Sequence, residues 1–102
     1  AATHLRTKLA EQYSRRFHLM AHSVDHSPRE ILRNVVRAAR RKADMTQGEL
    51  AGAIGRTQGY VSKFENGQTR AEMIDVIQFC VALEIDHHTL MDQLVDAYRA
   101  ER

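Results

Sequence analysis

The segment TQGELAGAIGRTQGYVSKFENG, residues 46–67, predicts two short helices joined by a tight turn. Thr46 and Glu49 form a capping box that begins the first helix, and Gly55 ends it. The second helix is predicted over residues 58–65, and Gly67 supplies the left-handed residue that closes it. The rest of the chain can be interpreted around this pair of helices.

Apolar and polar side chains separate cleanly on these two helices. Ala51 and Gly52 are small enough to allow a close helix crossing, and four larger apolar residues are expected to point inward: Leu50, Ile54, Val61 and Phe64. The outward face of the second helix then carries Gln58, Gly59, Ser62 and Lys63. Gln can pair with adenine, Lys donates to guanine, and Ser serves either base, so this face is suited to the major groove of DNA.

The stretch from about Ile31 to Leu90 resembles the Xre/Cro, lambda-repressor-like helix-turn-helix family. The residues that carry the resemblance are Arg40, Thr46-Gln47, Leu50-Ala51, Ile54-Gly55, Val61-Ser62, Glu65-Asn66-Gly67 and Leu83. The resemblance implies an all-α fold: a five-helix lambda-repressor-like helix-turn-helix domain, here with an added N-terminal amphipathic helix.

The site residues follow partly from this resemblance and partly from position. We expect Gln58, Ser62 and Lys63 to read bases, with a gap at Gly59, where family members often carry a reading side chain. The resemblance also implies a structural ion pair between Arg40 and Glu65 beneath the reading helix. Contacts to the DNA backbone are expected from Gln47, Arg56, Thr57, Tyr60, Asn66, Gln68, Thr69 and Arg70.

The N-terminal part of the chain carries its own helical pattern. Between residues 3 and 21, an apolar stripe recurs every three or four positions, which predicts an amphipathic helix; its members are Leu5, Leu9, Tyr13, Phe17 and Met20. The pattern breaks over residues 22–26. Ser27, Pro28 and Glu30 then predict a capped helix that continues to about Lys42. We therefore divide the chain into an extension, residues 1–26, and a DNA-binding domain, residues 27–102.

Two further helices are predicted after the central pair. Thr69 and Glu72 would cap a helix that ends near Glu84, and Asp86 would cap a last helix over residues 87–100. The expected apolar faces are Met73, Val76, Ile77, Cys80 and Leu83 on the first, and Leu90, Met91, Leu94, Val95 and Tyr98 on the second. In residues 28–42, Leu32, Val36 and Ala39 face the core, while Ile31 and Val35 form a second stripe. The N-terminal stripe is the nearest candidate to cover it.

Composition and charge limit the class of protein. The chain has 102 residues and a formal net charge of +2, but basic residues concentrate in residues 29–42, whereas residues 72–96 contain acids and no Lys or Arg. One part of the surface is therefore expected to be basic and another acidic. The lone Cys80 excludes an intramolecular disulfide, and no apolar run is long enough for a membrane span. These features favour a cytoplasmic protein without a membrane partner.

For several residues, the sequence allows either a structural or a functional role. His18, His22 and His26 could hold zinc if they lay on one continuous helix. The break in the helical pattern near Ser23 separates His26 from the other two, so we do not expect a metal site there. For Arg29, Arg33 and Arg37, a solvated helix face is slightly favoured over phosphate contact. Cys80 is expected to be a core residue rather than a redox sensor. The chain shows no enzyme motif, so neither catalytic residues nor a cofactor are expected.

These observations predict a sequence-specific DNA-binding transcriptional regulator. Its partner would be double-stranded DNA, and we expect a repressor that binds a palindromic operator as a homodimer built from one or both terminal helices. The alternative is an antitoxin or adaptor that uses the helical domain mainly to bind a protein partner.

Overall fold

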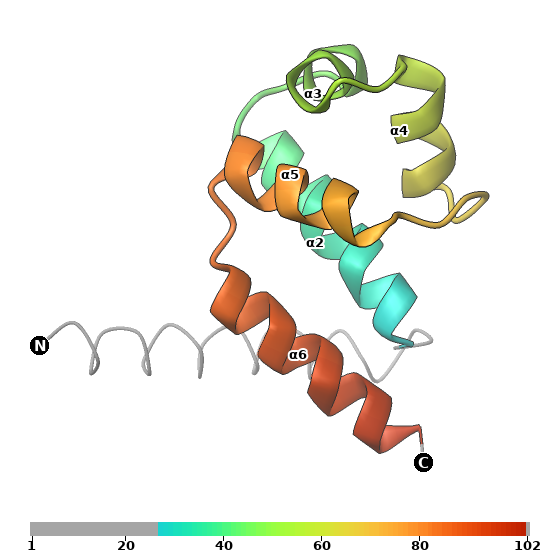
Figure 1. The fold of residues 1–102 in the computed structure, drawn as a ribbon, viewed down its shortest axis with the longest axis vertical. Coiled ribbons are helices and arrows are strands. Elements are labelled where there is room, and N and C mark those ends of the chain that lie inside the picture. Colours follow the sequence, from blue (N-terminus) through green and yellow to red (C-terminus); the bar gives the residue numbers. More distant parts are fainter. Residues whose placement is uncertain (1–26, 102) are drawn as a thin grey trace, which may run out of the picture.

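The computed structural model describes residues 27–101, and within this range the chain forms α-helices and no strand. The helices are α2 (Pro28–Lys42), α3 (Gln47–Ile54), α4 (Gln58–Glu65), α5 (Met73–Leu83) and α6 (His87–Ala100). The all-α, five-helix prediction is confirmed. The helix predicted for residues 3–21 lies outside the described residues. In Figure 1, α2 and α5 occupy the middle of the molecule, α3 and α4 lie at one end, and α6 lies at the other.

Capping side chains and left-handed glycines fix the ends of α2, α3 and α4, largely as the sequence predicts. The Thr46 hydroxyl accepts from the Glu49 amide and the Glu49 carboxylate accepts from the Thr46 amide, both at 3.0 Å. Gly55 and Gly67 adopt left-handed φ values of 69° and 77°. At the start of α2, Ser27 accepts from the Glu30 amide at 3.2 Å, but the Glu30 carboxylate pairs with Arg33 instead of returning to the cap. Only one half of that capping box is therefore present.

One core cluster joins α2 to the central helices. Val36 packs with the four inward residues of α3 and α4 and with Phe79 and Leu83 of α5. The rings of Phe64 and Phe79 stack with their centroids 5.0 Å apart. Ala51 is buried as expected, but Gly52 is exposed, and a Cβ added there would meet nothing within 4 Å. Gly52 therefore plays no part in the close crossing.

A second cluster fixes α6 against α2. Ile31 and Val35, the second stripe of α2, pack with Leu90 and Ala97 of α6. The sequence suggested the N-terminal stretch as the nearest cover for this stripe, whereas α6 takes that place in the described structure. The pattern in α2 showed that a partner was needed but could not identify it, because several apolar faces were available.

The start and the buried face of α5 differ from the sequence prediction. The cap is Glu72 rather than the predicted Thr69, so the helix begins at Met73. The Glu72 amide donates to the Asp75 carboxylate at 3.2 Å. The buried residues are Asp75, Phe79 and Leu83, four positions apart. Met73 and Ile77, placed by the sequence on the apolar face of this helix, are 63% and 51% exposed. The α5 helix meets α2 and α3 with one narrow face, which leaves its other apolar side uncovered.

The apolar face of α6 is likewise wider than its contact. Its buried residues are Thr89, Leu90, Gln93 and Ala97, whereas Met91, Val95 and Tyr98 remain exposed. The sequence predicted a broad apolar face on this helix, and only part of that face is buried. None of the helices in the described part of the chain is long and apolar enough to cross a membrane.

Candidate functional site

The exposed side of α4 carries the side chains that the sequence assigned to base reading. Gln58 and Lys63 are exposed and Ser62 is half-buried, while the opposite side of the helix buries Val61 and Phe64. Gly59 lies on the exposed side, so it leaves a gap between Gln58 and Ser62. Thr57 caps this helix by accepting from the Tyr60 amide at 3.1 Å. Gln58, Ser62 and Lys63 therefore form a short polar ridge along α4, and the Thr57 cap fixes where this helix begins.

Gln58 is positioned by a chain of hydrogen bonds that begins in the core. Its amide nitrogen donates to the Gln47 side-chain oxygen at 3.1 Å, and the Gln47 amide nitrogen donates to Glu65 Oε1 at 3.1 Å. The sequence placed Gln47 at the DNA backbone; in the structure its amide links α3 to both ends of α4. The link orients Gln58, whose amide has two donor hydrogens and an acceptor oxygen and so keeps further capacity for a base edge.

Glu65 is the centre of this network. Only 3% of it is exposed, and its carboxylate accepts two hydrogen bonds from Arg40: Nε at 2.7 Å and Nη2 at 2.9 Å. Arg40 also donates to the Met45 carbonyl oxygen at 2.8 Å. Burial acts to raise the pKa of Glu65, but the hydrogen bonds from Arg40 and Gln47 outweigh it and lower that pKa; the same bond raises the pKa of Arg40. The pair holds the C-terminal end of α4 to α2.

Two arginines of α2 have structural contacts that neither sequence interpretation foresaw. Arg37 donates to the backbone carbonyl of Glu65 at the end of α4, where unpaired carbonyl groups attract cations. The guanidinium of Arg33 pairs with Glu30 and lies beside Gly67, where an added Cβ would come within 3.1 Å of it. These side chains therefore support α4 rather than forming a purely solvated face.

A second buried carboxylate, Asp75, holds the other end of α4. It is 1% exposed and accepts from Arg56 Nε at 3.0 Å, Arg56 Nη2 at 2.9 Å and the Tyr60 hydroxyl at 2.8 Å. The Arg56 guanidinium also lies 4.5 Å from the centre of the Tyr60 ring. Arg56 and Tyr60, both assigned to the DNA backbone by the sequence, are thus held by Asp75 near the start of α4.

The pKa shifts of Tyr60 and Asp75 agree with these contacts. Burial, followed by the hydrogen bond to Asp75, raises the pKa of Tyr60 to about 12. Burial acts to raise the pKa of Asp75 as well, but the hydrogen bonds from Arg56 and Tyr60 lower it. The sequence reasoning missed Asp75. The available signal was its spacing of four from Phe79 and of eight from Leu83, which places it on the buried face of the same helix.

The remaining assigned residues surround the polar ridge. Asn66, Gln68 and Arg70 are exposed and Thr69 is half-buried, in the irregular segment that joins α4 to α5. Thr57 is exposed at the start of α4. Together with Arg56 and Tyr60, these residues flank both ends of α4, so that charged and polar groups lie on either side of its exposed face.

Neither a metal cluster nor a reactive thiol is evident in the described range. Residues 27–101 contain no group of three or more His, Cys, Asp or Glu that could hold a metal ion, and His18, His22 and His26 lie outside that range. His87 and His88 are exposed at the start of α6. Cys80 is half-buried, and burial raises the pKa of its thiol.

Comparisons with known proteins agree with the fold. Residues 31–102 match a family model described as a helix-turn-helix domain. The fold is also similar to the crystal structure of the clp gene regulator ClgR from Corynebacterium glutamicum, with a TM-score of 0.62 and 23% sequence identity; the match covers 76% of this chain and 83% of that one. No curated protein matches the chain.

Proposed function

Since the chain belongs to the helix-turn-helix domain family, we propose that it is a sequence-specific DNA-binding transcriptional regulator of the Xre, lambda-repressor-like type. Residues Gln58, Ser62 and Lys63 of α4 would read base edges in the major groove. The observation that carries the proposal is the polar ridge of α4, held at its two ends by the buried carboxylates Glu65 and Asp75. Reading base edges requires side chains fixed on a rigid element, and this ridge meets that requirement.

The groups that flank α4 are suited to the DNA backbone. The free N–H groups at the starts of α3 and α4 carry partial positive charge and attract phosphates. Arg70, Gln68 and Asn66 are exposed beyond the other end of α4. Arg56 keeps 39% of its side chain exposed while paired with Asp75, so its outer edge remains accessible to a phosphate. We infer that these contacts fix the register of α4 on the duplex.

We further propose a homodimer that represses transcription by occupying a palindromic operator, without catalytic activity of its own. A single reading helix offers few base contacts, whereas a dimer places two reading helices about 34 Å apart on one face of the duplex. Val95, an exposed apolar residue of α6 outside the space between α5 and α6, offers surface for protein contacts at the end of the molecule away from α3 and α4.

Selection of bound sequences from a random DNA pool tests these proposals together. Recovery of two inverted half-sites would support both base reading and dimerisation, and their spacing would give the separation of the two reading helices. Recovery of a single half-site would support base reading alone. Recovery of no consensus, with binding that also lacks a salt dependence, would contradict the proposed DNA function.

The second candidate is an antitoxin or adaptor that binds mainly another protein. The exposed apolar side chains between α5 and α6 are the observation that favours it. A stoichiometric second polypeptide that co-purifies with the chain, and that leaves it unable to bind any selected DNA, would favour this candidate over the regulator.

A further inference from the structure

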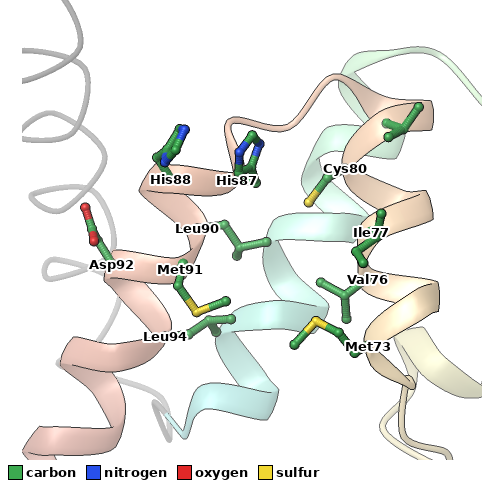
Figure 2. A pocket seen from close by; sticks show the side chains of 11 residues that line it. Met73, Val76, Ile77, Cys80, His87, His88, Leu90, Met91, Asp92 and Leu94 are labelled. Carbon is green, nitrogen blue, oxygen red and sulfur yellow. The ribbon is translucent and has the colours of Figure 1, made fainter. Parts of the chain in front are cut away.

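An open groove separates α5 from α6. Its volume is about 630 Å³. Figure 2 shows that side chains from the two helices point toward one another across it: Met73, Ile77 and Cys80 from α5, and Leu90, Met91 and Leu94 from α6. Asp92 lies on its outer edge and points away. The lining is therefore apolar along nearly its whole length.

The groove is exposed rather than filled by neighbouring side chains. Val81 is 75% exposed and Met91 46%, in addition to the outward residues of α5 described above. Both helices pack on α2, so the two sides of the groove are held apart. Contiguous exposed apolar surface of this kind is uncommon on a small monomeric domain and marks a binding surface.

The charge around the groove identifies the chemistry of its occupant. Asp92 lines the groove together with His87 and His88, and Glu72 and Asp86 directly precede the lining residues Met73 and His87. No Lys or Arg occurs from residue 71 to residue 98. An acidic rim of this kind would repel the same groove of a second copy, because like charges would face one another. It would instead attract a basic amphipathic segment.

The chain itself contains such a segment. Residues 3–21 carry four basic residues and one acid, Glu11, together with the apolar stripe that includes Leu9 and Phe17. As a helix, the stripe from Leu5 to Met20 would span about 22 Å, close to the length of about 21 Å expected for the 14 residues of α6. Charge, apolar spacing and length therefore all match the groove.

The connection to α2 permits docking within one molecule. Residues 21–26 can extend over about 20 Å, which exceeds the length of about 16 Å expected for α5. Ile31, one turn inside α2, belongs to the cluster that includes Val76 and Leu94, two residues that also line the groove. The segment therefore joins the described domain near the groove.

We propose that residues 3–21 dock as a basic amphipathic helix in the apolar groove between α5 and α6 of the same molecule. This interaction does not require DNA binding. It would cover the apolar side chains that line the groove and add a sixth helix to the domain.

Cys80 provides a probe inside the groove, since it is the only cysteine of the chain. The rate at which iodoacetamide modifies Cys80 is measured in the full chain, in the Leu9→Asp variant and in the Thr7→Asp control. Leu9 lies in the apolar stripe, whereas Thr7, two residues away, falls on the opposite side of the predicted helix. Both variants gain one negative charge, and both substitutions lie outside the core of residues 27–101.

We expect Leu9→Asp to raise the rate of Cys80 modification about tenfold and Thr7→Asp to leave it unchanged, because only the first disrupts the apolar contact. The rate in the unsubstituted chain should not depend on protein concentration. Equal rates in all three proteins, or equal increases in both variants, would overturn the proposal. Protection of Cys80 that disappears on dilution would overturn it as well, because a second copy would then cover the groove. Circular dichroism and the unfolding midpoint of the same samples report whether the domain remains folded.

Discussion

At one end of the molecule, α3 and α4 are fixed by buried carboxylates, whereas farther from that end α5 and α6 leave an open apolar groove between them. Glu65 and Asp75 each accept several charge-assisted hydrogen bonds, from Arg40 and Gln47 in one case and from Arg56 and Tyr60 in the other. The contacts of α6 with α2 are apolar, through residues such as Leu90 and Ala97. Directional hydrogen bonds thus fix the orientation of α4, while the non-directional contacts of α6 leave apolar surface exposed.

The difference lies in the kind of contact that holds each region of the domain. Hydrogen bonds depend steeply on distance and angle, so a network anchored on a buried carboxylate restricts α4 to one orientation. Apolar contacts tolerate varied partners as long as area is buried. The following predictions test this comparison, from the largest expected effect to the smallest.

Removal of Arg40 should be the most damaging single change at the α3–α4 end. The Arg40→Ala substitution leaves the buried Glu65 carboxylate without its bidentate partner, and we expect it to destabilise the domain by about 3–5 kcal/mol in urea unfolding. Exposed Lys63→Ala is the control and should leave the unfolding free energy nearly unchanged. A loss under about 1 kcal/mol for Arg40→Ala would show that the network does not hold α4.

Loss of the Asp75 carboxylate should be the next largest effect. In Asp75→Ala, Arg56 and the Tyr60 hydroxyl lose a shared buried acceptor, and we expect a cost of about 1–3 kcal/mol. The pH dependence identifies the charge. Because the folded-state pKa of Asp75 is lowered, its contribution is fully present above its ordinary pKa of about 4 and is lost as the pH falls through the folded-state value.

Thermal unfolding between pH 6 and pH 2 checks the charge of Asp75. The Asp75→Asn variant should lose less stability on acidification than the unsubstituted chain, while Asn in place of the exposed Asp92 serves as the control. If the two acid profiles of Asp75→Asn and the unsubstituted chain coincide, the carboxylate is not ionised in the folded protein and the comparison between the two ends fails.

Substitutions on the polar ridge should change DNA recognition rather than stability. If their contacts are bidentate, Gln58→Ala and Lys63→Ala should each lose about 1–3 kcal/mol of preference for the selected sequence. Arg70→Ala should instead weaken binding evenly across sequences and reduce its salt dependence. Competition binding on the selected and on scrambled DNA separates the two behaviours. If Lys63→Ala left the sequence preference unchanged, the assignment of base reading to this face of α4 would be wrong.

The smallest effect is expected at Gly59. A Cβ at this position would meet only Thr57 Oγ1, at 3.9 Å, so alanine fits without strain. Gly59→Ala should stabilise the domain by up to about 1 kcal/mol, because alanine is the better helix former. The free energy of urea unfolding measures this gain, and Gly67→Ala, at a positive φ and against Arg33, should instead destabilise.

Much of the fold could be predicted because helix ends and the central core depend on local spacing. The box of Thr46 and Glu49, the left-handed Gly55 and the inward positions Val61 and Phe64 follow from residues close in sequence. The start of α5 could not be predicted in the same way. Thr69 and Glu72 match the sequence pattern of a capping box, but in the structure the Glu72 amide donates to Asp75. The position of Asp75 depends in turn on Arg56, which lies outside α5.

The sequence by itself determined the helices, their order and the polar ridge of α4, since these depend on periodicity and capping within a few residues. Only the tertiary structure decided which charged groups are buried and which apolar faces remain open. Arg33 and Arg37 support the end of α4, Asp75 orders its start, and Met73 and Ile77 face a groove rather than the core. These outcomes depend on contacts between residues far apart in the chain, where burial, rather than hydrophobicity alone, sets the role of each side chain.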